Sequence, residues 1–346
     1  MPRPTRPPLS LLGVPLAVRP GGHVQIGSSP RTGSVVGPLS TADLAALVAW
    51  GCAPEASDAV ADHGARVVAD LVRGGAVPAG RVLAGPGPAD VPPGSSWAPD
   101  AAAWSAYDPA GPPRGARRQA RRERSVAVVG CGRTGAGVLR LLSAGGVGRL
   151  TAADDDVVDA SDLSPLGHRD TDLGVPRADA ALRRARGDDV REHPDGPADL
   201  VVVVDHHAAR ADRADGLVAD GIAHLSVVVR DTDALVGPLV LPGRTACLRC
   251  LDLHRCDADP DWPAVLGQFA QRPAGRAGRV LPEETATAAV LAGLVALQVF
   301  THLDGGAPSS LGATLELLLP EGVVQQRRWS PHPQCGCADL PVPHRA

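Results

Sequence analysis

Lysine and asparagine are absent from the sequence, and aromatic residues make up only 2% of its 346 residues. Without lysine, arginine must do any work that lysine does in other proteins. The formal net charge of -4 gives the chain no general attraction to nucleic acid or to an anionic membrane. We expect no signal peptide, because the N-terminal segment lacks a long apolar stretch. The most apolar helical run, 286–300, is shorter than a membrane span and is predicted to be a buried helix.

Cysteine is sparse but clustered: four of the seven cysteines form a CxxC and a CxC pair, at Cys247, Cys250, Cys335 and Cys337. Two close thiol pairs without a secretory signal fit a tetrahedral structural zinc site better than a disulfide framework. They also indicate a reducing, cytoplasmic location. A redox pair and unrelated buried thiols are the alternatives, and Cys256 is a substitute ligand.

A strand, a glycine turn, a helix and a second strand are predicted over residues 126–156. The turn has the GxGxxG spacing at Gly130, Gly132 and Gly135, and the second strand ends at Asp154. In such a unit the glycines allow close approach of a phosphate chain to a helix N-terminus, and the acid accepts from a ribose hydroxyl. The pattern therefore predicts a nucleotide-binding fold.

Strands and helices continue to alternate after this unit, with buried strands predicted at 199–204 and 224–229. The prediction is an α/β domain with a mostly parallel, Rossmann-like sheet and helices on both faces. Ligands of such sheets bind at the carboxyl ends of the strands, where Gly130, Asp154 and Asp205 are expected to converge.

A separate N-terminal unit is predicted to be a small winged helix-turn-helix. Its expected elements are strands at 14–18, 23–26 and 34–36 and helices at 41–50 and 61–72. Arginines and acids are nearly balanced here, so we favour peptide binding by strand addition over binding to DNA. The strand at 23–26 and the helix that ends near Gly74 are expected to form the groove.

The segment from about 85 to 123 is predicted to be a linker rich in proline, glycine and arginine. Its arginines, between Arg114 and Arg124, are interpreted as a solvated helix face rather than as an arm for a phosphate or an acidic partner.

Several single residues invite a chemical interpretation but have a simpler one. Cys131 lies in the glycine turn without an evident base, so it is read as a small residue rather than a nucleophile. His206 and His207, at the end of a strand, are expected to be packed or exposed. His254 and His332, near the cysteines, are weaker candidates for donors to the zinc ligands.

The glycine turn, the acidic second strand, the run VVVVDHH and the two cysteine pairs together resemble the ThiF/MoeB superfamily of ubiquitin-activating-like adenylyltransferases, over about residues 124–338. The resemblance implies nucleotide binding by the three glycines and by four charged residues, namely Asp154, Asp156, Arg177 and Asp205. Arg177 stands where that family has a phosphate-binding lysine, and Asp205 stands where it has an acid associated with magnesium. Pro165 and Leu166 stand where the family has arginine and glutamine, and Asp162 stands where it has asparagine. These departures predict a degenerate ATP site, since proline has no donor for a phosphate.

The chain also resembles a subgroup of this superfamily, the ThiF-like partner proteins of thiazole/oxazole-modified microcin biosynthesis. The similar segments are 236–247, 250–254, 259–262 and 328–337. That resemblance implies a winged-helix leader-peptide recognition domain at 1–84, a linker at 85–123, a ThiF-like domain at 124–338 and a tail at 339–346. It implies a non-catalytic or weakly catalytic protein that presents a precursor leader to a YcaO-type cyclodehydratase. Zinc is the expected cofactor, ATP with magnesium is doubtful, and a homodimer without nucleic acid or membrane is expected.

Two other functions stay open. The first is an active ATP-dependent adenylyltransferase that activates a peptide or ubiquitin-like C-terminus, with Arg177 and Asp205 as its catalytic residues. The second is a transcription factor that binds DNA through residues 1–80.

Overall fold

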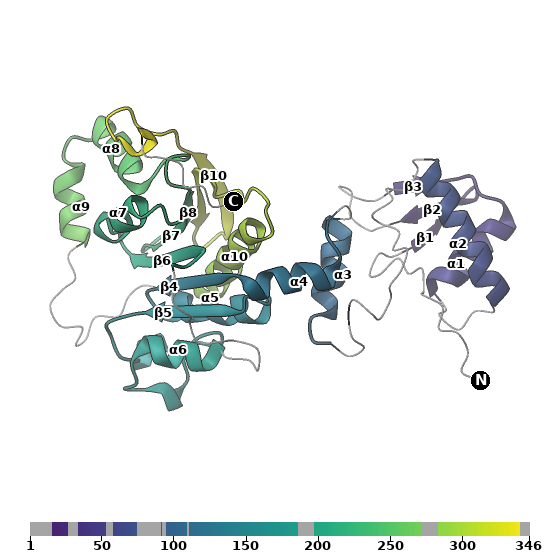
Figure 1. Cartoon of the computed structure of the whole chain (residues 1–346), viewed down its shortest axis with the longest axis horizontal. Coiled ribbons are helices and arrows are strands. Elements are labelled where there is room, and N and C mark those ends of the chain that lie inside the picture. Colours follow the sequence, from purple (N-terminus) through teal and green to yellow (C-terminus); the bar gives the residue numbers. More distant parts are fainter. Residues whose placement is uncertain are drawn as a thin grey trace. The chain divides into compact units, whose positions relative to one another are not determined.

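The computed structural model describes residues 16–26, 34–52, 58–74, 91, 95–108, 111–185, 197–270 and 283–339. The chain divides into two compact units, Met1–Arg118 and Gln119–Ala346. Figure 1 shows both units, with a small sheet in the first and a large sheet in the second.

The first unit contains a three-stranded antiparallel sheet in the order β1-β2-β3. The strands are β1 (Leu16–Arg19), β2 (His23–Ile26) and β3 (Ser34–Val36), and the helices are α1 (Thr41–Cys52), α2 (Asp58–Arg73) and α3 (Ala98–Tyr107). Gly21 and Gly22 have φ of 75° and 76°, as the tight hairpin between β1 and β2 requires. The predicted order of three strands and two helices is confirmed for β1 to β3, α1 and α2, whereas α3 lies in the segment that was predicted to be a linker.

A small core holds this unit together, with three buried residues from the sheet and two from the helices. Its buried members are Val24, Ile26, Val36, Leu47 and Val68. The hydroxyl of Ser40 accepts from the backbone N–H of Asp43 at 3.1 Å and so caps the N-terminus of α1.

Helix α4 (Arg114–Glu123) corrects the expectation of a solvated arginine face. Arg114, Arg117 and Arg121 are only 6%, 6% and 3% exposed. Within the first unit, the Arg117 guanidinium lies 5.7 Å from the ring centre of Trp104 and pairs with Asp108. The arginines are therefore packing groups, because guanidinium planes stack well on aromatic faces.

The second unit is built on a seven-stranded sheet in the order β10-β9-β8-β7-β6-β4-β5. The strands are β4 (Ser125–Val129), β5 (Arg149–Ala153), β6 (Leu200–His206), β7 (His224–Val229), β8 (Asp233–Val240), β9 (Ala313–Leu318) and β10 (Val323–Arg328). The four strands β4 to β7 are parallel, and β8 to β10 are antiparallel. The mixed α/β, Rossmann-like sheet predicted from the sequence is thus confirmed.

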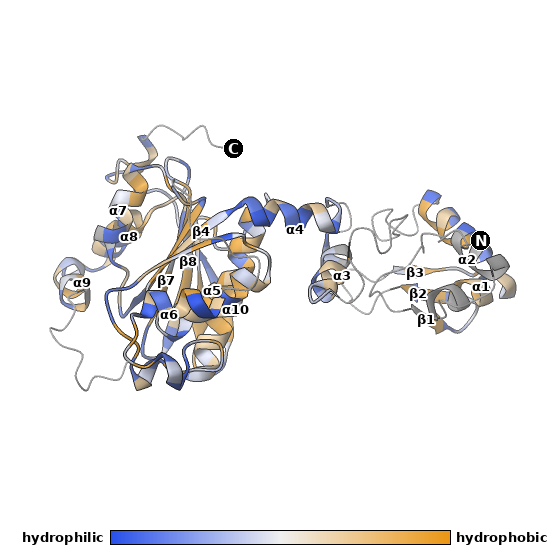
Figure 2. Cartoon of the chain, turned by 60° about the horizontal axis from the view of Figure 1, so that its bottom comes forward, coloured by the Kyte–Doolittle hydropathy of each residue, from blue (hydrophilic) through white to orange (hydrophobic). Residues whose placement is uncertain are grey.

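Valine runs explain the parallel centre of this sheet. Strands β6 and β7 are buried along almost their whole length, as expected when both faces are covered. The helices of this unit are α5 (Arg133–Ala144), α6 (Arg177–Ala185), α7 (Ala211–Ala219), α8 (Leu248–Ala258), α9 (Trp262–Ala270) and α10 (Thr285–Leu303). Figure 2 shows the hydrophobic strands at the centre and the hydrophilic surface of α4. By contrast, all six residues of β10 are exposed.

Helix α10 is the one helix among the described residues that is long and apolar enough to cross a membrane. It packs against α5 and β8 instead, and Leu291, Val295 and Val299 are fully buried in the main core. The predicted buried helix is confirmed, although Val290 and Leu297 remain 50% and 62% exposed.

Candidate functional site

The glycine turn joins β4 to α5, and two of its glycines have steric reasons to be glycine. Gly130 has φ of 90°, and a Cβ there would lie 2.3 Å from the Val204 carbonyl oxygen on the neighbouring strand. A Cβ on Gly135 would lie 1.9 Å from the carbonyl oxygen of Gly130. Gly132 caps α5 in an extended conformation, and its Cβ position would lie near only a carboxylate oxygen of Asp162. The turn thus brings the start of α5 against β4 and β6, as the fold of nucleotide-binding units requires.

Asp154 ties this turn to the end of β5. One carboxylate oxygen accepts from the backbone N–H of Cys131 at 2.7 Å, and the other accepts from the N–H of Asp156 at 2.9 Å. The acid expected to bind a ribose therefore already binds two backbone donors. Its remaining lone pairs could still accept from a hydroxyl.

Arg177 lies at the centre of an acidic cluster. Its side chain is 2% exposed, and its guanidinium donates to both carboxylate oxygens of Asp162, with N···O distances of 2.7 and 2.5 Å. The carboxylates of Asp156, Asp154 and Asp159 lie 3.4, 4.0 and 4.0 Å from the same guanidinium. One cation thus faces four acids, so the cluster carries negative charge.

This cluster gives Asp162 a role that the sequence did not reveal. A bidentate pair occupies the planar fork of a guanidinium, which is the part of arginine that would otherwise grip a phosphate. The expected phosphate ligand Arg177 is therefore committed to a carboxylate of its own chain. Asp154, Asp156 and Arg177, which the family resemblance implies as nucleotide ligands, lie together in an internal ion-pair network.

Pro165 and Leu166 do not supply the side-chain donors that the family has at these positions. Pro165 is exposed, and its carbonyl oxygen accepts from Arg140 at 3.0 Å. The Leu166 Cβ lies 3.5 Å from where a Cβ on Gly137 of α5 would stand. Neither residue can donate a hydrogen bond to a phosphate from its side chain.

Asp205 lies in β6 beside the glycine turn, where the sequence places it. Its side chain is 5% exposed and accepts from the N–H of Arg210 at 3.0 Å and from the Arg213 guanidinium at 3.2 Å. Burial raises the pKa of this carboxyl, although these two arginines oppose the shift. An acid that is buried and already paired with a guanidinium is a poor ligand for magnesium, which prefers free carboxylate oxygens and water.

Glu283 is a second buried acid that the sequence analysis did not place in the site. It precedes α10, accepts from the Thr134 hydroxyl in the first turn of α5, and lies 3.3 Å from His206 Nε2. Burial alone would raise the pKa of Glu283, but hydrogen bonds from His206 and Thr134 and the charge of Arg133 lower it overall. His206 is therefore a packed partner of Glu283. The sequence shows Glu283 only as an acid before the start of a helix, a pattern too common to mark a site.

The Cys131 thiol has low reactivity. Its side chain is fully buried, and burial together with the nearby Asp154 charge raises the pKa of the thiol to about 12. A thiol with such a pKa is not a nucleophile near neutral pH, which agrees with the small-residue interpretation.

The four paired cysteines meet at the start of α8. The Sγ atoms of Cys247 and Cys250 lie 3.8 Å apart, Cys335 lies 3.5 Å from Cys247, and Cys337 lies 3.3 Å from Cys250. A tetrahedron with Zn–S bonds of about 2.3 Å has S···S edges of about 3.8 Å, so the four ligands fit zinc with a closed shell. Cys256 lies outside this group, and the six cysteines whose side chains the structure describes are all free thiols.

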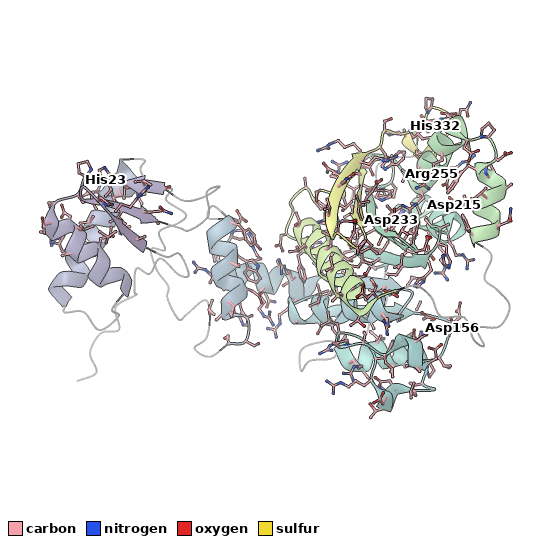
Figure 3. The ribbon with its side chains drawn as sticks, turned by 180° about the vertical axis from the view of Figure 1, so that it is seen from behind. His23, Asp156, Asp215, Asp233, Arg255 and His332 are labelled. Atoms are coloured by element: carbon pink, nitrogen blue, oxygen red, sulfur yellow. The ribbon has the colours of Figure 1, made fainter. Side chains whose placement is uncertain are left out.

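His254 and His332 do not donate to the thiols through their side chains, which corrects that expectation. The Nδ1 atom of His332 accepts from the Gln334 N–H, so Nε2 carries the proton and donates to Asp257 at 3.0 Å. His254 Nε2 lies 3.0 Å from the Ser330 carbonyl oxygen. The group that reaches a thiol is the backbone N–H of His332, which donates to Cys250. Figure 3 shows His332 and the acidic-cluster residue Asp156 at opposite ends of the second unit, so the thiol and acidic sites are distinct.

A glycine-turn sheet domain with a four-thiol cluster defines a Rossmann-like fold, and known proteins share parts of its sequence and its fold. Residues 105–189 match the ThiF family. A SAMP-activating enzyme E1 from Haloferax volcanii is 38% identical over 109 residues, which span 31% of this chain and 36% of that protein.

Solved structures share the fold over nearly the whole chain. Escherichia coli MccB with ATP matches with a TM-score of 0.67 and 16% identity, covering 94% of this chain and 97% of that one. MccB with AMPCPP and the MccA peptide matches with a TM-score of 0.68 and 16% identity, covering 94% and 98%. PaaA matches with a TM-score of 0.63 and 16% identity, covering 92% and 99%. At this identity the likeness establishes the fold.

Proposed function

We propose that this chain binds the leader of a ribosomally made precursor peptide through residues 1–84 and presents it to a separate YcaO-type cyclodehydratase for azoline formation. In this proposal residues 85–123 connect that domain to a ThiF-like domain at 124–338, which acts as a scaffold. The solved structures of MccB with the MccA peptide support peptide recognition by a protein of this fold.

The observation that carries the proposal is the small sheet of the first unit. Within the described residues, β1 and β3 each pair with β2 alone, so each leaves one edge for an added strand. Val18 on β1 and Val35 on β3 are 57% and 51% exposed, which gives a peptide apolar side chains to cover at either edge.

This topology corrects the expected groove. Strand β2 (His23–Ile26) is the central strand and has partners on both sides, so an added strand cannot pair with it. The docking edge is therefore β1 or β3.

Fluorescence polarisation with labelled leader peptides from candidate precursors tests the proposal on the full chain. Val18→Asp and Val35→Asp are a matched pair, because both replace an exposed valine on an outer strand. We expect wild type to bind a cognate leader, and one of the two variants to weaken binding by at least about tenfold. Unchanged binding by both variants would reject strand addition, and no binding of any cognate leader by wild type would reject the function.

The alternative, an ATP-dependent adenylyltransferase, is favoured by the glycine turn and by the partial match to an E1 enzyme. It requires Arg177 and Asp205 to act on a triphosphate and its magnesium, although both are engaged in ion pairs. ATP–pyrophosphate exchange with candidate peptides separates the two functions. Robust exchange that is lost in Asp205→Ala would favour the enzyme.

We further propose structural zinc on Cys247, Cys250, Cys335 and Cys337, a cytoplasmic location and a homodimer. Zinc would supply no chemistry here beyond fixing the C-terminal loop to α8, since four thiolates leave no open position for water or substrate. Neither nucleic acid nor membrane binding is part of the proposal.

A further inference from the structure

The N-terminus of α5 is surrounded by carboxylates of the chain itself. In nucleotide-binding units this helix end receives a phosphate group, because its first N–H groups point outward and carry partial positive charge. Here Asp154 accepts from the Cys131 N–H in the turn. An Asp162 oxygen lies 3.7 Å from the position that a Cβ on Gly132 would occupy. Glu283 accepts from Thr134, in the first turn of the helix.

The two arginines at this helix end are also committed. Arg177 is held by both oxygens of Asp162. Arg133 donates to the carbonyl oxygens of Ser161 at 2.7 Å and of Glu283 at 2.8 Å. An incoming phosphate would meet carboxylates where it needs cations.

We infer that Asp162 and Glu283 take the place of nucleotide phosphates and hold this site closed to ATP. Their side chains are 7% and 6% exposed, so water screens their charges weakly. Like charges a few ångströms apart in such surroundings repel strongly, and a triphosphate carries several negative charges. The inference goes beyond leader binding, because the peptide edge of the first unit uses none of these residues.

Removing the two charges without changing the size of the side chains tests this inference. In Asp162→Asn the Arg177 guanidinium loses its bidentate carboxylate partner and keeps only the more distant acids, of which Asp156 at 3.4 Å is the nearest. In Glu283→Gln the helix end loses its internal anion. We expect the double variant of the full chain to bind ATP at least about tenfold more tightly than wild type in isothermal titration calorimetry. Adding Arg177→Ala to Asp162→Asn should abolish the gain, because that arginine would be the freed phosphate ligand.

Asp179→Asn is the matched control. Asp179 is exposed in the first turn of α6, so this change removes one negative charge near Arg177 without touching the glycine turn. ATP affinity should be unchanged in this control. Inorganic triphosphate and adenosine serve as separate probes, and only the former should gain affinity in the double variant.

Two results would overturn the inference: wild type binding ATP as tightly as the double variant, or a folded double variant that gains no affinity. Thermal unfolding and zinc content establish folding, and Glu283→Gln alone repeats the test without disturbing the Arg177 pair. Leader affinity, measured on the same samples, should be unaffected. A failed leader test and a failed nucleotide test are therefore distinguishable.

Discussion

Replacing Arg121 by alanine tests whether a buried arginine stabilises the sheet unit. Arg121 is 3% exposed, and its guanidinium donates to both oxygens of Asp304 at 2.7 and 2.6 Å and to the Gly145 carbonyl oxygen at 3.1 Å. It also lies 4.3 Å from the ring centre of Phe300. Alanine would remove this guanidinium from a carboxylate that is only 15% exposed.

Breaking a buried ion pair from one side costs about 3–5 kcal/mol. In a unit of this size each kcal/mol lowers the melting temperature by roughly 2–4 °C, so we expect Arg121→Ala to lower it by about 6–20 °C. Thermal unfolding of the full chain, followed by circular dichroism, measures the shift.

Arg124→Ala is the control for this measurement. Its partner Asp199 is 3.4 Å away, and the two side chains are 44% and 33% exposed. Such a pair contributes at most about 1 kcal/mol, so the melting temperature should fall by less than about 4 °C. The double variant Arg121→Ala with Asp304→Ala should be less destabilised than the sum of the two single variants. A shift for Arg121→Ala no larger than that of Arg124→Ala would refute the reasoning.

Two further perturbations have defined outcomes. Cys250→Ser, or a chelator, should remove about one zinc per chain and open the C-terminal loop, while the sheet remains folded. A colorimetric zinc assay and limited proteolysis check this, and a wild-type chain without zinc would contradict it. Gly135→Ala should destabilise the second unit by about 1–3 kcal/mol or more, because its Cβ would lie 1.9 Å from a backbone oxygen. Gly293→Ala, which meets nothing within 4 Å on α10, should instead be neutral or stabilising by about 0.5–1 kcal/mol in chemical denaturation, and equal losses in both variants would contradict the steric argument.

The fold was predictable because its determinants are local in sequence. Valine runs identify strands that are buried on both faces, and the spacing of Gly130 and Gly135 identifies a turn that only glycine can make. The grouping of the thiols followed from two short spacings and the tetrahedral preference of zinc.

The charge network was not predictable in the same way. Several aspartates follow β5, and the sequence does not show which of them pairs with Arg177. The structure shows that Asp162 is this partner. The polar pattern of α4 likewise predicts a solvated helix, whereas the aromatic and acidic partners that bury Arg121 are remote in sequence. Pairings of long charged side chains depend on tertiary geometry, whereas hydrophobic periodicity reports only secondary structure and the buried face of each element.

Strand β10 determines how the large sheet ends. Within the described part of the chain it pairs only with β9, so its outer backbone groups face solvent along six residues. Four of those residues are the polar run Gln325 to Arg328, and Arg327 is fixed by Glu316 at 3.0 Å. Charged and amide side chains along a border strand oppose the joining of two sheets edge to edge. This border therefore disfavours pairing between two copies of the sheet, and charge-removing changes at Arg327 and Arg328 are expected to make such pairing easier.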